Sequence, residues 1–125
     1  MITPQSIAPR LAEAIILPDG LYLKREDLHP FGSHKGRSIP LMIEKYCDRG
    51  VNNFVISSSG NAAIAAMLSV VEHNKHDPDS SISLSVYLGK SIPKNKLDKI
   101  LQLAKRQKEI TIKQLDNPKQ TAFLA

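Results

Sequence analysis

Residues 54–73, FVISSSGNAAIAAMLSVVEH, join a strand signal to a helix signal through a short polar turn. The β-rich run at residues 54–56 predicts a buried strand, because it is short, apolar and bounded by turn residues. Residues 57–61 break that run, and residues 62–73 are nearly all apolar in their first half, which predicts a buried helix. A strand that turns directly into a buried helix indicates a unit of an α/β fold.

The alternation of strands and helices continues on both sides of this unit. The upstream segments predict, in chain order, a short helix at residues 10–17, a short strand at residues 21–24 and a helix from Arg37 that Gly50 ends. The downstream segments predict a polar loop at residues 73–81, a strand at 82–88, an amphipathic helix at 93–108, a strand at 110–112 and the opening of a helix from Pro118. This order predicts an α/β fold, a parallel three-layer sheet with flanking helices and right-handed crossovers.

Length and composition limit the class of protein. The 125 residues suit one domain, and 42% hydrophobic residues are enough for a core. The single cysteine, Cys47, excludes an internal disulfide, no metal-ligand cluster is visible, and a reduced, cytoplasmic setting is expected. No apolar run is long enough to cross a bilayer, and the N-terminus lacks a secretory signal pattern.

The net charge of +5 raises the alternative of a basic α/β module that binds nucleic acid. The excess of basic residues is concentrated between Lys90 and Lys108, where it is typical of a solvated helix face. Aromatic residues are sparse and do not interleave with the basic ones, which argues against a base-stacking platform. Nucleic-acid binding is therefore the weakest of the alternatives.

The turn at residues 57–61 has the composition of an anion site. A strand that enters a helix leaves unpaired backbone N–H groups at the helix start, where the helix dipole also favours negative charge. Gly60 permits a ligand to approach the backbone, and Asn61 can cap the helix or donate its amide to a ligand. The alternative is that this turn holds Ser, Gly and Asn only because they cap helices.

The stretch HPFGSHKGRS, residues 29–38, places Lys35 where a loop enters a helix, between Gly32 and Gly36. Partial burial against the positive end of a helix disfavours an ammonium ion, and a neutral lysine amine forms a Schiff base with an aldehyde. The alternative is a solvated lysine in a polar loop. Neither this stretch nor the serine-rich turn decides the function alone.

Together, the ordered segments KREDLHPFGSHKGRS (residues 24–38) and SSSGNAAIAA (residues 57–66) resemble the fold type II pyridoxal-phosphate enzymes, the tryptophan synthase β superfamily. The family pattern is "K-x-E-x-x-N-P-T-G-S-F-K-x-R", followed by a "S-S/T-G-N" loop that opens a helix. The matching residues are Lys24 to Leu28, Pro30, Gly32, Ser33, Lys35 and Arg37 in the first segment, and Ser58 to Asn61 in the second. Thr3-Pro4 resembles the family's start, and residues 85–100 resemble a later strand and helix. The turn is most similar to that of threonine synthases, with serine/threonine dehydratases and cysteine synthases close behind.

The resemblance implies roles for Lys35 and for the residues of the serine-rich turn. Lys35 would form the Schiff base with pyridoxal 5'-phosphate and later act as acid and base, and Asn61 would hydrogen-bond the ring hydroxyl of the cofactor. The substrate α-carboxylate would be held by the residues of the turn, Ser58, Ser59, Gly60, Asn61 and Ala62. The implied reaction is a β- or γ-elimination or replacement on an amino acid, as in a threonine synthase-like lyase or synthase.

The resemblance also implies a domain organisation. Residues 1–30 would pack on a large domain, leaving the strand at 21–24 without its home sheet, and residues 31–125 would form the small α/β domain, incomplete at its C-terminus. The chain has no Gly-rich phosphate loop and looks truncated, so we expect weak cofactor binding or none. The implied partners are an amino-acid substrate, a missing large domain or second chain, and further copies of the chain. The alternative is a non-catalytic remnant or split-enzyme subunit that binds a partner chain or a small carboxylate ligand.

The sequence departs from the family pattern at several positions around the lysine. His34 replaces the usual Phe, Phe31 a small Thr, Gly36 a common Asp and Ser38 a common Gly. These departures concern the identity of the substrate more than the binding of the cofactor.

Overall fold

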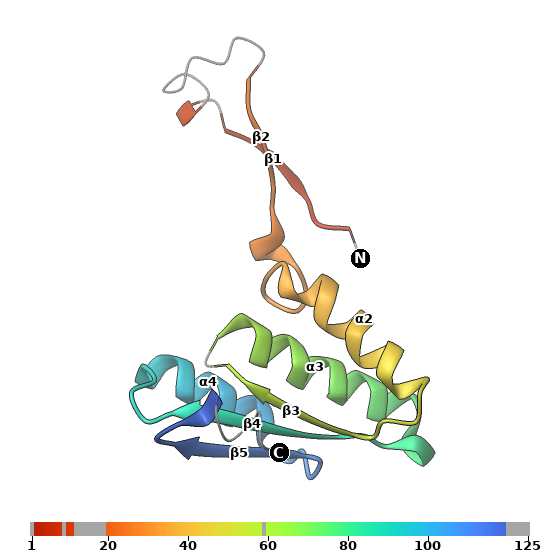
Figure 1. Cartoon of the computed structure of the whole chain (residues 1–125). Coiled ribbons are helices and arrows are strands. Elements are labelled where there is room, and N and C mark those ends of the chain that lie inside the picture. The colour runs from red at the N-terminus through yellow and green to blue at the C-terminus, as the bar shows by residue number, and fades with distance from the viewer. Residues whose placement is uncertain (1, 9, 12–19, 59, 120–125) are drawn as a thin grey trace.

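The computed structural model describes residues 2–8, 10–11, 20–58 and 60–119, and it forms a parallel sheet with helices beside it (Figure 1). The sheet has the order β3-β4-β5. Its strands are β3 (Asn53–Ser57), β4 (Ser83–Gly89) and β5 (Ile110–Leu115), and the helices beside them are α2 (Lys35–Cys47), α3 (Asn61–His76) and α4 (Lys94–Ala104). The predicted α/β class is confirmed.

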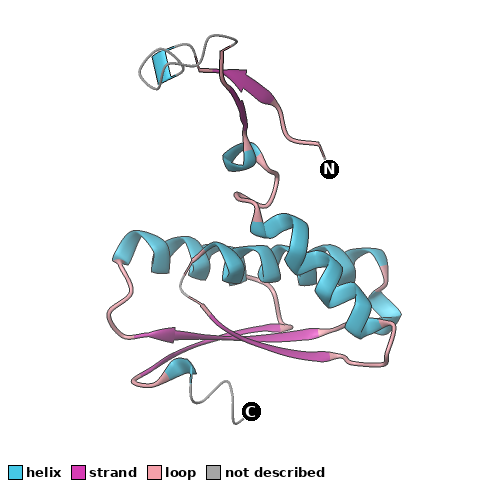
Figure 2. Ribbon diagram, turned by 45° about the horizontal axis from the view of Figure 1, so that its top comes forward, coloured by secondary structure: helices cyan, strands magenta, loops and turns pink. Residues whose placement is uncertain are grey.

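The core lies between one face of the sheet and the helices. In β4, Leu84, Val86 and Leu88 are buried, whereas the alternate residues of the strand are only half-buried. This alternation arises because successive strand side chains point to opposite faces. The buried face packs against α3 and α4, and Figure 2 shows the three long helices on one side of the sheet. The helix side of the core includes Met67 and Ile100, both fully buried.

The direction of the chain places two helix starts at one edge of the sheet. β3 and β4 are parallel, with Ile56 opposite Val86, and α3 returns antiparallel to them as the crossover. α2 precedes β3 and packs along α3, running in the same direction (Figure 1). The amino ends of α2 and α3 therefore both lie toward the carboxyl ends of the strands.

An N-terminal arm, residues 2–8 and 20–24, stands away from the sheet and its helices (Figure 1). Its strands β1 (Gln5–Ile7) and β2 (Tyr22–Lys24) pair antiparallel, so the strand predicted at residues 21–24 has a partner that the sequence pattern did not reveal. The 3₁₀ helix η1 (Glu26–Leu28) connects the arm to α2. The predicted helix at 10–17 and the one opening at Pro118 fall mostly outside the described residues.

Helix α2 begins earlier and ends earlier than its apolar pattern predicts. It starts at Lys35, so Pro40, which we expected in the first turn, is the sixth residue of the helix. Gly50 does not cap the helix itself; it has a φ of +86°, and its N–H donates to the Cys47 carbonyl in the turn that follows. That conformation is one that glycine adopts without steric cost.

The other helix boundaries differ by a few residues. α3 extends to His76, and a 3₁₀ helix, η2 (Pro78–Ser80), occupies the rest of the predicted loop. α4 ends at Ala104, four residues before the predicted end, because Arg106 adopts a φ of +68° that reverses the chain into β5. None of the helices in the described ranges is both long and apolar enough to cross a membrane.

We expect Leu88→Ala to lower the free energy of unfolding by about 2–5 kcal/mol, because the side chain is fully buried and its removal leaves a cavity. Leu41→Ala is the matched control, since the Leu41 side chain on α2 is 66% exposed and its loss should change stability by less than about 0.5 kcal/mol. Urea unfolding followed by circular dichroism measures both. Equal losses for the two variants would contradict this assignment of the core.

Candidate active site

Lys35 is the first residue of α2 and is half-buried. The helix start is stabilised by Ser33, whose Oγ accepts the Lys35 N–H at 3.2 Å and whose carbonyl accepts the Gly36 N–H at 3.1 Å. The N-cap itself is His34, which makes no side-chain capping hydrogen bond, and the Ser33 hydroxyl bonds the backbone two residues on, as in an ST turn. The loop before it turns at Gly32, which has a φ of +87° and donates its N–H to the His29 carbonyl at 2.7 Å. The lysine backbone is thus held at the end of a tight, hydrogen-bonded loop.

Three residues of the family pattern, Lys24, Glu26 and Arg37, meet around Thr3 in what we call the Glu26 cluster. The Arg37 guanidinium donates to both Glu26 carboxylate oxygens, from Nε to Oε2 at 2.7 Å and from Nη2 to Oε1 at 2.8 Å. The buried Thr3 donates its hydroxyl to Glu26 Oε1 at 2.6 Å, and Lys24 Nζ donates to the Thr3 carbonyl. The cluster joins the N-terminal arm to the first turn of α2, two residues after Lys35.

The hydrogen bonds from Arg37, and then from Thr3, lower the pKa of Glu26 to about 2. The carboxylate therefore stays ionised at any pH at which the protein is used, because charge-assisted, bidentate bonding favours its charged form. The Glu26 cluster has a structural role rather than a catalytic one. The sequence motif contains these residues, but it gave no indication of what they do.

The serine-rich turn lies between the end of β3 at Ser57 and the start of α3 at Asn61. Gly60, not Asn61, is the N-cap, so Asn61 does not cap the helix and its side chain is exposed. The Gly60 N–H donates to Ser58 Oγ at 3.3 Å, and a Cβ built on Gly60 would meet no atom within 4 Å. The space beside Gly60 is therefore open at the start of α3, and Ser59 falls outside the described residues.

A pocket of about 290 Å³ lies at this carboxyl edge of the sheet. It is lined by Ser57, Ser58, Tyr87, Gly89, Pro118 and Lys119. Sequence reasoning found the two serines but missed Tyr87 and Lys119. The signal for Tyr87 was its position near the carboxyl end of a predicted strand, the edge where open α/β sheets bind ligands. Lys119 carried no such signal.

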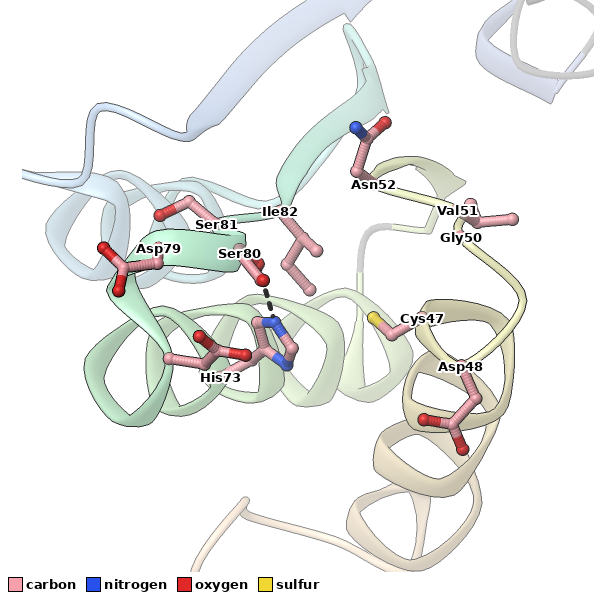
Figure 3. Close-up of a pocket in the computed structure, with 11 residues that line it drawn as sticks. Cys47, Asp48, Gly50, Val51, Asn52, His73, Asp79, Ser80, Ser81 and Ile82 are labelled. Carbon is pink, nitrogen blue, oxygen red and sulfur yellow. Dashed lines mark hydrogen bonds between the residues drawn. The ribbon is translucent and has the colours of Figure 1, made fainter.

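A larger hollow of about 490 Å³ lies at the opposite edge, before β3 and β4 (Figure 3). It contains none of the predicted site residues and includes Asp48, Asp77 and Asp79, whose carboxylates would repel an anion. Burial, with help from the nearby carboxylates, raises the pKa of the Cys47 thiol, which makes it a poor nucleophile. His73 Nε2 is hydrogen-bonded to the Ser80 carbonyl at 2.9 Å. The smaller pocket is therefore the better candidate for binding an anionic ligand.

The structure brings the two predicted motifs to the same edge of the fold. Lys35 begins α2 and Asn61 begins α3, and the two helices pack side by side in the same direction (Figure 1). Each helix start carries partial positive charge from its dipole. No direct contact joins the Lys35 side chain to Ser58, Gly60, Asn61 or Ala62 among the hydrogen bonds of the described residues. Within those residues, no group of three or more His, Cys, Asp or Glu side chains could hold a metal ion.

Lys35 and the serine-rich turn both lie toward the carboxyl edge of the sheet, which is where open α/β sheets bind ligands. The family model for pyridoxal-phosphate dependent enzymes matches residues 2–115, and the chain belongs to that family. The family predicted from the two motifs is confirmed. No curated protein shows a significant match to the sequence.

Solved structures share the fold at low sequence identity. A pyridoxal 5'-phosphate-dependent aspartate racemase is 20% identical with a TM-score of 0.75, over 98% of this chain and 36% of that chain. An L-serine ammonia-lyase from the fungus Rhizomucor miehei is 19% identical with a TM-score of 0.70, over 99% of this chain and 37% of that one. Diaminopropionate ammonia lyase from Escherichia coli, solved with an aminoacrylate-PLP azomethine reaction intermediate, is 16% identical with a TM-score of 0.70, over 99% and 32%. The chain spans about a third of the length of each of these proteins.

We expect Glu26→Gln to reduce the acid sensitivity of the fold. The pKa of Glu26 is about 2 in the folded chain against an ordinary 4.5, so the unfolded chain binds more protons between these values. The stability from Glu26 is therefore complete above pH 4.5 and is lost as pH falls toward 2. Urea unfolding at about pH 6 and about pH 3 should show a smaller loss for Glu26→Gln than for the wild type. Glu109→Gln, at an exposed position, is the control, and the same loss in all three proteins would contradict the role of the Glu26 cluster.

Proposed function

We propose that this chain forms the lysine-bearing part of a pyridoxal-phosphate-dependent lyase or synthase that acts on an amino acid by β- or γ-elimination or replacement. The observation that carries the proposal is the shared edge: the amine-bearing start of α2 and the anion-binding start of α3 lie together at the carboxyl ends of the strands. An amine and an anion site are what a cofactor aldehyde and a substrate carboxylate require.

The residues at this edge fit the cofactor. Lys35 is half-buried, and the open space at Gly60 leaves room for a ligand against the backbone. Pyridoxal phosphate, when bound, supplies an aldehyde that reacts with amines and a ring that withdraws electrons from the substrate. Lys35 Nζ would hold the cofactor and then carry a proton to or from the substrate. The Asn61 amide would orient the ring by a hydrogen bond to its hydroxyl.

The substrate carboxylate would be held by the turn from Ser58 through Ser59, Gly60 and Asn61 to Ala62. Backbone N–H groups and a helix dipole orient an anion without a charged side chain, which would leave the Lys35 amine for proton transfer. Among members of the family, the turn sequence favours a threonine synthase-like reaction. Two of the similar solved structures are ammonia-lyases by name, which supports elimination chemistry.

We propose that residues 1–30 pack on a second structural unit, in the same polypeptide or in another chain, and that residues 31–125 form the small domain. The N-terminal arm exposes large apolar side chains, with Ile7 66% and Tyr22 56% exposed. A two-stranded hairpin is marginally stable alone, so these side chains gain from burial against a partner. The same observation supports the second candidate, a split-enzyme subunit or non-catalytic remnant. Assembly with further copies and a reduced, cytoplasmic setting belong to the proposal as well.

The proposal is tested by adding pyridoxal phosphate to the chain, reducing with borohydride and mapping the pyridoxyl adducts by mass spectrometry. We expect Lys35 to be labelled roughly tenfold or more faster than the exposed Lys96 on α4, because the site orients the aldehyde against one amine. Lys35→Arg should lose this label without a change in the urea midpoint. Equal labelling of Lys35 and Lys96 would contradict the proposed function.

We expect Gly60→Ala to weaken cofactor capture while leaving the fold intact. The new methyl group meets no atom of the protein, so the free energy of unfolding should change by less than about 1 kcal/mol. It would occupy the space beside the anion site and should raise the half-saturating concentration of pyridoxal phosphate for Lys35 labelling roughly three- to tenfold.

Gly50→Ala is the matched control for this variant, because Gly50 lies at the opposite edge with a φ of +86°. It should cost stability through backbone strain and leave the half-saturating concentration unchanged. The reverse pattern in the two variants would place the ligand site elsewhere.

A further inference from the structure

The loop that precedes Lys35 is built around a buried histidine. His29 is 4% exposed, and its Nδ1 accepts the Phe31 N–H at 3.0 Å. Its ring meets the Phe31 ring edge-on, with centroids 5.8 Å apart and an interplanar angle of 69°. The ring thus fixes the backbone of the loop from the inside.

The same ring lies directly against the second residue of α2. A Cβ added to Gly36 would stand 2.3 Å from His29 Cε1, 2.4 Å from His29 Nδ1 and 2.8 Å from Phe31 Cβ. Such distances are far inside van der Waals contact, so any side chain at position 36 would displace the histidine or the start of the helix. Gly36 does not have a positive φ. Position 36 therefore requires glycine because there is no room for a Cβ, and not because of its backbone conformation.

This contact links two departures from the family pattern, those at positions 29 and 36. The pattern has Asn, Thr and commonly Asp where this chain has His29, Phe31 and Gly36. The His29 ring fills the space that a side chain at position 36 would need, and the Phe31 Cβ borders that space. His29 and Gly36 form a matched pair next to Lys35.

We propose that His29 is a positioning residue for Lys35: its ring, held by the Phe31 N–H and packed on Gly36, fixes the first turn of α2 and so the direction of the lysine amine. The inference rests on the proposed function of Lys35 and adds a residue that touches neither cofactor nor substrate. Because Lys35 and Gly36 are adjacent in one helical turn, a shift of Gly36 moves the Lys35 backbone with it.

The test uses the full 125-residue chain as wild type, His29→Ala, His29→Asn, Gly36→Ala and the double variant His29→Ala/Gly36→Ala. The first readout is the ratio of pyridoxyl label on Lys35 to label on Lys96 after reduction with borohydride. We expect a roughly five- to tenfold fall of this ratio in His29→Ala, the size expected for loss of one orienting hydrogen bond. His29→Asn should restore most of the ratio, because its side-chain oxygen can accept the Phe31 N–H as an Asx turn does.

Gly36→Ala should lower the ratio in the wild-type background and have a smaller effect once His29 is alanine, because the two closest clashing atoms are then absent and only the Phe31 Cβ remains. The second readout is the hydrogen exchange of the Phe31 amide, which should lose protection in His29→Ala and keep it in His29→Asn. This readout does not depend on the cofactor, so it tests the loop even in a variant that labels poorly. His34→Ala, an exposed histidine in the same loop, is the matched control and should change neither readout.

The outcomes separate this inference from the proposed function. If the wild type labels Lys35 selectively and His29→Ala keeps both the ratio and the Phe31 protection, the positioning role of His29 is wrong and the function of Lys35 stands. A Gly36→Ala penalty of the same size with and without the imidazole would also overturn the inference. If the wild type itself shows no preference for Lys35, the proposed function fails and the positioning role fails with it.

Discussion

The bidentate ion pair between Arg37 and Glu26 is the interaction on which the arrangement around Lys35 depends. Its two N–H···O bonds of 2.7 and 2.8 Å join a residue of the first turn of α2 to the 3₁₀ helix that follows the N-terminal arm. Thr3 adds a third hydrogen bond to the same carboxylate, at 2.6 Å. The planar guanidinium fixes both distance and orientation, which a lysine at position 37 would not do. The start of α2 is thereby held from outside the helix.

The opposite end of the site is built by topology rather than by side-chain contacts. A right-handed crossover from β3 to β4 requires α3 to start where β3 ends, and the hydrophobic residues of α3 fix that helix on the sheet. The position of the serine-rich turn is therefore a consequence of chain direction. The space beside Gly60 is open, so a ligand could approach the backbone there.

Sequence patterns predicted the parallel sheet well because β4 has a strict alternation and α3 a long apolar run, both of which depend on local periodicity. They predicted the motif residues but not which of them bond to one another. That Glu26 and Arg37 form a cluster with Thr3 depends on contacts 11 and 34 residues apart in the chain, from Arg37 to Glu26 and to Thr3. The pairing of β1 with β2 was missed because Gln5–Ile7 is only three residues long. Tyr87 and Lys119 were also missed, because only the tertiary structure brings them to the pocket beside Ser58.

The place of Lys35 along α2 has a mechanical consequence. The helix has 13 residues and is roughly 20 Å long, and the ion pair holds it two residues from its first one. If α2 tilts by about 5° around that point, its far end moves by roughly 1.5 Å, whereas the backbone of Lys35 moves by only a few tenths of an ångström. Lys35 therefore lies close to the point around which the helix would tilt. A tilt that moves the Cys47 end would therefore leave the Lys35 backbone almost stationary.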